Sequence, residues 1–192
     1  MTVFVDSDVA VEHEGWNSYL ENCETFIHSI AQDVFRDLTE YPAEPALNLV
    51  SFPHRNGKIE IAVLLADDAT LQELNRNWRG KDQPTNVLSF PSSDPVILPD
   101  ESVFLGDLAL SFNTVEREAR EQDKTFQQHT AHLIIHGILH LLGYDHETDQ
   151  DAEYMEKREI AILARMNLPD PYADHDAAVQ TESNEIKAAN NE

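Results

Sequence analysis

Apolar residues recur along the chain either at the spacing of helices or in short continuous runs. Residues three or four positions apart share one face of a helix, so segments with that spacing are expected to be helical. These segments are 16–39, 68–78, 113–123, 125–142 and 148–166. Short apolar runs predict strands at 2–6, 46–52, 59–66 and 103–111. Residues 87–90 are also apolar, and the proline-containing stretch 91–102 is predicted to be a loop.

Capping residues support the predicted helix ends. Asn113 with Glu116 resembles a capping box, in which two side chains satisfy the free backbone N–H groups of the first turn. Thr148 with Asp151 predicts the start of the last helix in the same way. Gly80 tolerates the left-handed conformation that ends a helix.

Together these elements predict one α/β domain with a mixed sheet of about four strands. Strands 46–52 and 59–66 flank a Pro-His-Arg-Asn-Gly turn and are expected to form a hairpin. Segment 125–142 is apolar on most sides, which is typical of a central, buried helix. The domain is predicted to span 1–168. Residues 169–192 are acidic and poor in large apolar side chains, and are expected to form a disordered tail.

Charge distinguishes one segment from the rest. The chain has 13 basic and 36 acidic residues and a net charge of −23, which argues against a generally basic surface for nucleic acid. Within 51–90 the two signs balance, and the basic residues there are Arg55, Lys58, Arg76, Arg79 and Lys81. If the protein binds an anion, this segment is where we expect the site, and solvated surface charges would give the same pattern.

Cysteine usage and hydropathy set the expected compartment. A single cysteine, Cys23, excludes an intrachain disulfide and a zinc site built from cysteines. No stretch approaches the ~18 apolar residues of a membrane span, and the first residues do not resemble a signal peptide. We expect a cytoplasmic protein with no membrane partner.

Three histidines fall at positions i, i+4 and i+10 near the end of the central helix. His136 and His140 lie one turn apart, so both imidazoles can reach one ion. Gly143 allows the chain to reverse and bring His146 back towards them. Three neutral imidazoles with an open fourth position are typical of a catalytic zinc site, where the ion acidifies a water nucleophile. The sequence predicts one Zn²⁺ per chain.

Neighbouring residues are candidates for supporting this site. His132 precedes His136 by one turn, and we expect it to support a ligand or pack in the core rather than bind the ion. Asp145 and Glu147 flank His146 and could orient an imidazole or simply be solvated.

One position separates this pattern from that of zinc proteases. The protease pattern H-E-x-x-H-x-x-G-x-x-H has a glutamate after its first histidine, and that glutamate is the general base. Here the position is Gly137. Peptide hydrolysis by that mechanism is therefore disfavoured, and another substrate or another proton acceptor is needed.

Three motifs occur in order within about residues 60–165. They are NWRGKDQPTNVLSFP at 77–91, LGDL at 105–108 and HGILHLLGYDH at 136–146. With these motifs the chain resembles the bacterial YbeY-type endoribonucleases, rRNA maturation factors once grouped as predicted metalloproteases. The two long motifs are specific, and the acidic tail lies outside the resemblance.

The resemblance implies a zinc-dependent endoribonuclease specific for single strands. Its role would be rRNA processing, at the 3′ end of the small-subunit (16S) rRNA, together with ribosome quality control. Its partners would be RNA and the small ribosomal subunit or associated proteins. The resemblance also implies that His136, His140 and His146 bind zinc and that Arg79 is the basic residue of the same cleft.

Residue chemistry is consistent with these roles. A guanidinium can hold two phosphate oxygens through parallel hydrogen bonds and stabilise the charge that develops on them, so Arg79 is the predicted catalytic residue. Lys81 could add a contact to a backbone phosphate. Asp107 could orient substrate or a ligand, or stabilise a turn. Gly106 before it could allow another backbone or a ligand to approach closely.

Several alternatives stay open on the sequence. Either a metal-bound water or the ribose 2′-hydroxyl could attack phosphorus, and three imidazoles also suit nickel or copper. The negative net charge predicts modest affinity for naked RNA. The rival functions are a metallopeptidase with a different base and a non-enzymatic ribosome-assembly factor. The latter would have a structural metal and an acidic surface for basic ribosomal proteins.

Overall fold

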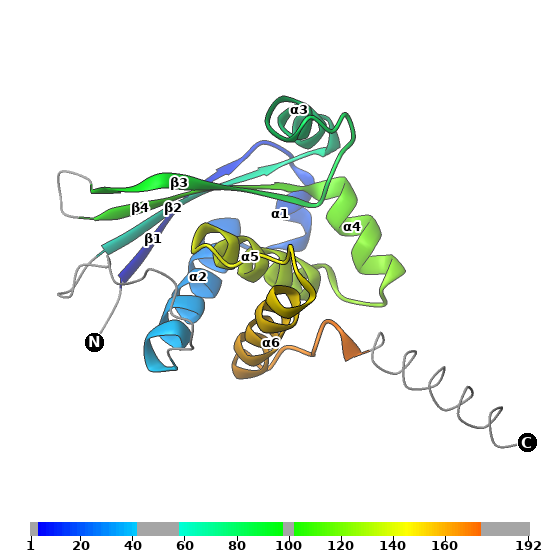
Figure 1. Ribbon diagram of the computed structural model, residues 1–192. Helices are drawn as coiled ribbons and strands as arrows, with labels where there is room; N and C mark the ends of the chain where they lie inside the picture. Colours follow the sequence, from blue (N-terminus) through cyan, green and yellow to red (C-terminus); the bar gives the residue numbers. More distant parts are fainter. Residues whose placement is uncertain (1–3, 42–57, 98–101, 174–192) are drawn as a thin grey trace, which may run out of the picture.

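The computed structural model describes residues 4–41, 58–97 and 102–173, without the side chains of 93–97 (Figure 1). These ranges contain four strands and six helices. In chain order they are β1 (Phe4–Val11), α1 (Gly15–Tyr19), α2 (Cys23–Glu40), β2 (Lys58–Ala66), α3 (Asp68–Arg79), β3 (Val87–Ile97), β4 (Val103–Ser111), α4 (Phe112–Glu121), α5 (Phe126–Leu141) and α6 (Asp149–Arg165). The strand expected at 46–52, and with it the predicted hairpin, lies outside the described residues.

The strands form one mixed sheet in the order β1-β2-β4-β3. β1, β2 and β4 run parallel, and β3 pairs antiparallel with β4 at the edge. In β2, Ile59, Ile61, Val63 and Leu65 are buried in alternation because successive side chains point to opposite faces of a sheet. The predicted α/β domain with a mixed sheet of about four strands is confirmed.

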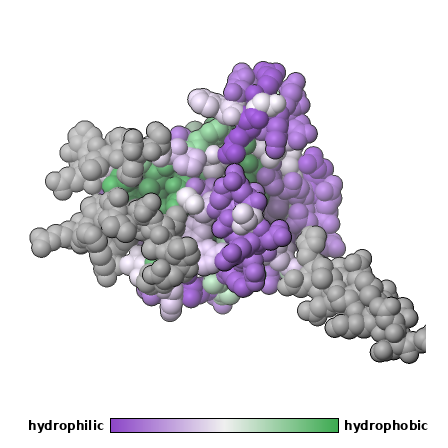
Figure 2. Space-filling model, in the orientation of Figure 1, coloured by the Kyte–Doolittle hydropathy of each residue, from purple (hydrophilic) through white to green (hydrophobic). Residues whose placement is uncertain are grey.

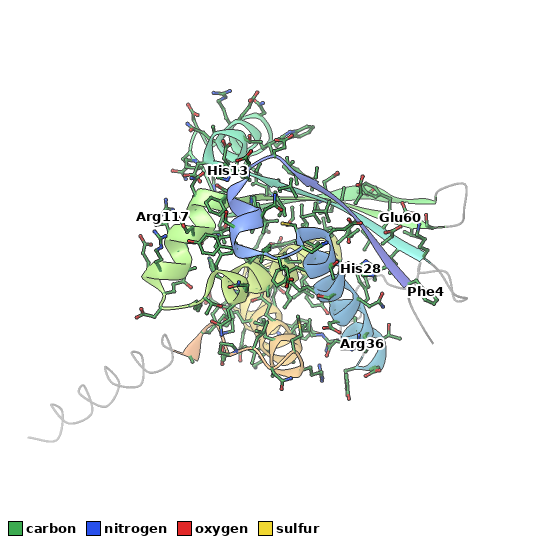
Figure 3. The ribbon with its side chains drawn as sticks, turned by 180° about the vertical axis from the view of Figure 1, so that it is seen from behind. Phe4, His13, His28, Arg36, Glu60 and Arg117 are labelled. Carbon is green, nitrogen blue, oxygen red and sulfur yellow. The ribbon has the colours of Figure 1, made fainter. Side chains whose placement is uncertain are left out.

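Most helices lie on one face of this sheet. In Figure 1, α3 lies above the sheet, whereas α1, α2, α5 and α6 lie below it. Ile134, Ile135 and Ile138 of α5 are fully buried in the core, so the predicted central helix is confirmed. Figure 3 shows the same arrangement from behind, with the exposed residues His28 and Arg36 labelled on α2.

The single helix predicted at 16–39 is wrong, because the segment forms two helices. Between α1 and α2, Leu20 is extended, with φ −114° and ψ 118°. Asn22 then caps α2 by accepting the Thr25 N–H at 2.8 Å. The buried residues Trp16 and Cys23 lie on either side of the break, so apolar spacing alone did not reveal it.

The capping box predicted at Asn113 is also wrong. Ser111 is the N-cap residue of α4 and makes no side-chain capping bond. The Asn113 side chain instead accepts the Asp68 N–H at 3.3 Å, which ties the start of α4 to the start of α3. Thr148 does cap α6, accepting the Asp151 N–H at 3.2 Å.

Residues 91–97, expected in a loop, belong to β3. The pairing with β4 is irregular between Pro91 and Val96. Proline is tolerated there because an edge strand has one side without ladder hydrogen bonds. Gly106 lies opposite Pro91 with φ 140°, and a Cβ on it would be 2.2 Å from the carbonyl oxygen of Phe90. The close approach predicted at Gly106 is therefore made by the β3 backbone.

The domain boundary at residue 168 stays a prediction. Residues 169–173, which it assigns to the tail, lie against the helices. The Lys124 Nζ donates to the Pro171 carbonyl at 2.9 Å, and the Tyr172 ring meets the His132 ring edge-on at 5.5 Å between centroids. Residues 174–192 lie outside the described residues.

Hydropathy varies over the surface. Figure 2 shows hydrophilic residues over α3 and apolar residues along the sheet. In the part of the chain that the structure describes, each helix is too short or too polar to span a membrane.

Candidate metal centre and cleft

His136 and His140 present their imidazoles side by side on one face of α5. Their Nε2 atoms are 3.1 Å apart. Two imidazoles on one tetrahedral zinc ion would have their nitrogens ~3.3 Å apart, given Zn–N bonds of ~2.0–2.1 Å. The pair is therefore spaced to share an ion.

The end of α5 brings the third histidine to this pair. Gly143 has φ 86°, and the Tyr144 N–H bonds back to the Leu139 carbonyl at 3.0 Å, so the chain reverses there as predicted. The His146 ring centroid lies 5.0 Å from that of His140 and 5.6 Å from that of His136. One ligand nitrogen from each histidine lies within 4.8 Å of the other two.

In His136 and His140, the second ring nitrogen, Nδ1, already has a hydrogen-bond partner. His136 Nδ1 lies 2.7 Å from Glu159 Oε1, and His140 Nδ1 lies 2.9 Å from the Tyr144 carbonyl oxygen. A proton on Nδ1 leaves the Nε2 lone pair free, which is the arrangement found in metal-binding histidines. The donor set and its supporting partners therefore fit a metal ion.

The protonation state of His140 also suits a ligand. Burial and then the neighbouring His136 lower the pKa of His140. The neutral imidazole, which is the form that binds metal, is thereby favoured.

Glu159 of α6 is the buried carboxylate behind the site, with no exposed surface. Its Oε1 faces His136, and its Oε2 lies 2.9 Å from His132 Nε2. Burial alone would raise the pKa of Glu159, but the hydrogen bonds from His132 and His136 outweigh it and lower the pKa to about 2. A carboxylate that stays ionised is a strong acceptor for the His136 Nδ1–H.

No sequence motif indicated a role for Glu159. The available signal was its place on the buried face of α6, four residues after Met155 and three before Ile162. A glutamate in such a stripe is rarely fully buried without a partner.

The structure places two of the predicted supporting residues, His132 and Asp145, beside the ligand cluster. His132 Nε2 lies 2.9 Å from Glu159 Oε2, and the His132 ring lies edge-on to that of His136 with 6.3 Å between centroids. Asp145 Oδ1 accepts the backbone N–H of His146 at 2.8 Å. Asp145 therefore stabilises the loop that carries His146.

An open cleft of about 510 Å³ connects the histidines to the end of α3. Arg79, the last residue of α3, lines it together with Lys81 and Asp145. Gly80 follows with φ 69° and ends the helix. One guanidinium nitrogen of Arg79 donates to the Ser89 carbonyl at 3.2 Å, which holds the side chain beside β3. The predicted cationic residues thus share one cleft with the histidines.

A polar bridge fixes the loop between α3 and β3. The Asn86 side chain donates to Glu118 at 2.9 Å and accepts the Val87 N–H at 2.7 Å. Glu118 also lies 2.8 Å from His129 Nε2. Burial would raise the pKa of Glu118, but the hydrogen bonds from His129 and Asn86 outweigh it and lower the pKa. No sequence pattern predicted this bridge, because its members lie far apart in the chain.

Asp107 is not brought to the cleft. It lines a separate groove of about 410 Å³ with Trp78 and Phe90, between α3 and the sheet. The substrate or ligand role that the sequence allowed for Asp107 therefore does not belong to the histidine site.

Gly137 has a packing explanation. A Cβ at this position would lie 2.8 Å from Leu108 Cδ2 and 3.3 Å from Ser89 Oγ. A glutamate could replace Gly137 only if the Leu108 side chain shifted. The position of the protease general base is filled by the sheet.

Comparison with known proteins gives consistent matches. Residues 21–167 match the family model described as endoribonuclease YbeY. An endoribonuclease YbeY of Rhodopseudomonas palustris is 54% identical over 121 residues, which are 62% of this chain and 64% of the relative. That of Magnetococcus marinus is 48% identical over 151 residues, 74% of this chain and 99% of the relative. That of Methylocella silvestris is 42% identical over 173 residues, 90% of this chain and 89% of the relative.

Proposed function

This chain belongs to the YbeY endoribonuclease family, and we propose that it is a metal-dependent endoribonuclease that cleaves single-stranded RNA. The observation that carries this proposal is that one open cleft contains both three imidazoles suited to a metal ion and the guanidinium of Arg79. Cleavage of a phosphodiester increases the negative charge on its non-bridging oxygens. A metal ion on the histidines and the Arg79 guanidinium would be two cationic groups on one cleft, and both could stabilise this added negative charge.

We propose that His136, His140 and His146 hold one Zn²⁺ ion per chain. Zinc favours imidazole ligands, and three protein ligands leave a fourth position for water or substrate. When bound, the ion would polarise a phosphoryl oxygen and acidify water. The protein keeps two of the imidazoles oriented, because Glu159 bonds to His136 Nδ1 and the Tyr144 carbonyl bonds to His140 Nδ1.

Arg79 is the proposed catalytic residue on the other side of the cleft. Its guanidinium carries five N–H donors in a fixed fork, of which one contacts Ser89. The remaining donors can hold two oxygens of the scissile phosphate in parallel and stabilise their charge in the transition state. Lys81 is proposed to contact a flanking phosphate of the same strand.

The proposed substrate is ribosomal RNA, at the 3′ end of the small-subunit (16S) rRNA, with a further role in ribosome quality control in the cytoplasm. The net charge of −23 opposes binding of RNA by charge alone. We therefore propose that the small ribosomal subunit or an associated protein presents the RNA to the cleft.

A peptidase has less support. The position of its general base is Gly137, which packs against Leu108 of the sheet. A general base of the zinc-protease type at that position would have to displace the buried Leu108 side chain.

The test is cleavage of a single-stranded RNA that spans the 3′ end of the small-subunit rRNA, by wild type, Arg79→Ala and His140→Ala purified identically. We expect cleavage by wild type only. Equal cleavage by all three would mark a contaminating nuclease, and no cleavage of free or ribosome-bound RNA would contradict the proposal. The product ends distinguish attack by water from attack by the 2′-hydroxyl, because only the latter gives a 2′,3′-cyclic phosphate.

A further inference from the structure

The Glu159 carboxylate has a third partner besides the two histidines. The Tyr172 hydroxyl donates to Glu159 Oε2 and lies 3.3 Å from His132 Nε2. The oxygen on the far side, Oε1, is the one that faces His136. The two oxygens therefore have different tasks, since one is held by two donors and the other orients a proposed metal ligand.

Tyr172 reaches this place from a segment that follows α6. The Tyr172 N–H bonds to Asp170 Oδ1 at 2.8 Å, and the preceding Pro171 carbonyl accepts from Lys124. The Tyr172 ring stands at 86° to that of His132. These contacts fix the phenol from its backbone, its ring and its hydroxyl.

Tyr172 lies beyond residue 167, where the match to the family model ends. The hydrogen bond to Glu159 thus comes from a segment outside the matched region. Tyr172 also lines a second cavity, of about 580 Å³, and His136 and Asn86 line both this cavity and the cleft that contains Arg79.

We propose that Tyr172 is a positioning residue for the metal centre, acting through Glu159 on His136. Its hydroxyl and His132 hold Oε2, which fixes the plane of the carboxylate and keeps Oε1 aimed at His136 Nδ1. The proton of His136 is thereby held on Nδ1, and Nε2 stays free towards His140. This inference rests on the proposed metal site, but its effect on His136 exists in the metal-free protein as well.

The test uses the full chain with Tyr172→Phe, which removes the hydroxyl and keeps the ring. Tyr19→Phe is the matched control, because the Tyr19 hydroxyl also donates to a carboxylate, that of Glu116, at 2.6 Å. Two quantities are measured: Zn²⁺ affinity by competition with a chromogenic chelator, and the nitrogen-15 shifts of the His136 ring in the metal-free protein. The shifts report which ring nitrogen carries the proton.

Tyr172→Phe is expected to weaken Zn²⁺ binding about tenfold, the lower end of the range for partners of metal ligands. It should also reduce the fraction of His136 with the proton on Nδ1, while Tyr19→Phe changes neither quantity. In a Glu159→Gln background, Tyr172→Phe should cause little further loss of affinity, because both changes break the same chain of contacts.

Equal behaviour of Tyr172→Phe and Tyr19→Phe in both measurements would overturn the proposal. A full additional loss in the Glu159→Gln background would also contradict it, since Tyr172 would then act by another route. Failure of the wild type to bind Zn²⁺ would overturn the proposed metal function instead. In that case unchanged His136 shifts in Tyr172→Phe still reject the positioning role, and altered shifts support it.

Discussion

The two sides of the cleft are built differently. On the histidine side, His136 and His140 stand on α5, His146 stands on the loop before α6, and His136 is backed by a carboxylate of α6 with no exposed surface. On the opposite side, Arg79 and Lys81 stand at the end of α3 and in the loop after it, and both are exposed. In the part of the chain that the structure describes, the Arg79 side chain makes one hydrogen bond.

This difference matches what each side is proposed to bind. A metal ion requires ligands fixed in distance and direction, which buried hydrogen bonds provide. A single RNA strand is flexible and carries a repeated charge, so exposed cations that can adjust are suited to it. The histidine side should therefore be sensitive to small changes in hydrogen bonding, and the arginine side to charge and salt.

The largest effect is expected from removing a ligand. His140→Ala leaves two of the three imidazoles and removes the member nearest to both others. We expect Zn²⁺ binding to be lost and RNA cleavage to fall to background. Atomic absorption measures the bound Zn²⁺, and an assay with labelled RNA measures cleavage. Retention of one Zn²⁺ per chain by a folded His140→Ala protein would show that the ion lies elsewhere.

Arg79→Ala should impair RNA cleavage and leave Zn²⁺ binding intact. We expect cleavage to fall about 10²–10³-fold, the usual cost of removing a group that stabilises transition-state charge. Zn²⁺ affinity should be unchanged, because the Arg79 side chain is held by the Ser89 carbonyl of β3 and not by the partners of the histidines, Glu159 and the Tyr144 carbonyl. Single-turnover cleavage and chelator competition on the same preparation give the two values.

Arg79→Lys sharpens this result. Lysine keeps the charge but cannot make two parallel hydrogen bonds to a phosphate. Its cleavage rate should therefore lie between those of Arg79→Ala and wild type. Full activity of Arg79→Lys would show that charge alone is needed on this side of the cleft.

Glu118→Gln should weaken the bridge that joins the two sides. The pKa of Glu118 is lowered by its hydrogen bonds from His129 and Asn86, so the ionised form stabilises the folded state. That contribution is present above the ordinary glutamate pKa of ~4.3 and is lost as pH falls through the lowered folded-state pKa. Glu118→Gln should cost about 1–2 kcal/mol at neutral pH and progressively less under acid conditions.

Urea unfolding of the metal-free protein between neutral and acid pH measures this difference. Glu121→Gln is the control, because Glu121 is an exposed neighbour on α4 whose oxygen lies 3.8 Å from Arg117. Such a pair contributes little to stability. A stability difference between wild type and Glu118→Gln that grows as pH falls would contradict the assigned sign.

The sequence predicted the parts of the molecule that depend on local spacing. His136, His140 and the reversal at Gly143 lie within eight residues, so helix geometry and glycine conformation were enough to predict their meeting. The central helix followed from its apolar composition. The resemblance to the YbeY-type endoribonucleases predicted Arg79 in the same cleft as the histidines, and in the structure Arg79 lines that cleft.

The contacts that sequence analysis missed join residues distant in the chain. Glu159 approaches His136 only because α6 packs on α5, and Tyr172 approaches Glu159 only because the following segment folds back. The break between α1 and α2 was missed for a different reason. Its flanking residues Trp16 and Cys23 are both buried, so the apolar spacing continued across a change in backbone conformation.

Lys81→Ala should have the smallest effect and should appear mainly as a change in salt dependence. Loss of one phosphate contact reduces the slope of log affinity against log salt by about 1 and weakens binding similarly for all sequences. Binding is measured in the His140→Ala background, which prevents cleavage, by fluorescence anisotropy at several salt concentrations. Lys157→Ala is the matched control, because Lys157 is an exposed lysine on α6 that pairs with Glu153. The same reduction in slope for both variants would mean that Lys81 acts only through the net charge of the protein, whereas a reduction for Lys81→Ala alone places a phosphate at the arginine side of the cleft.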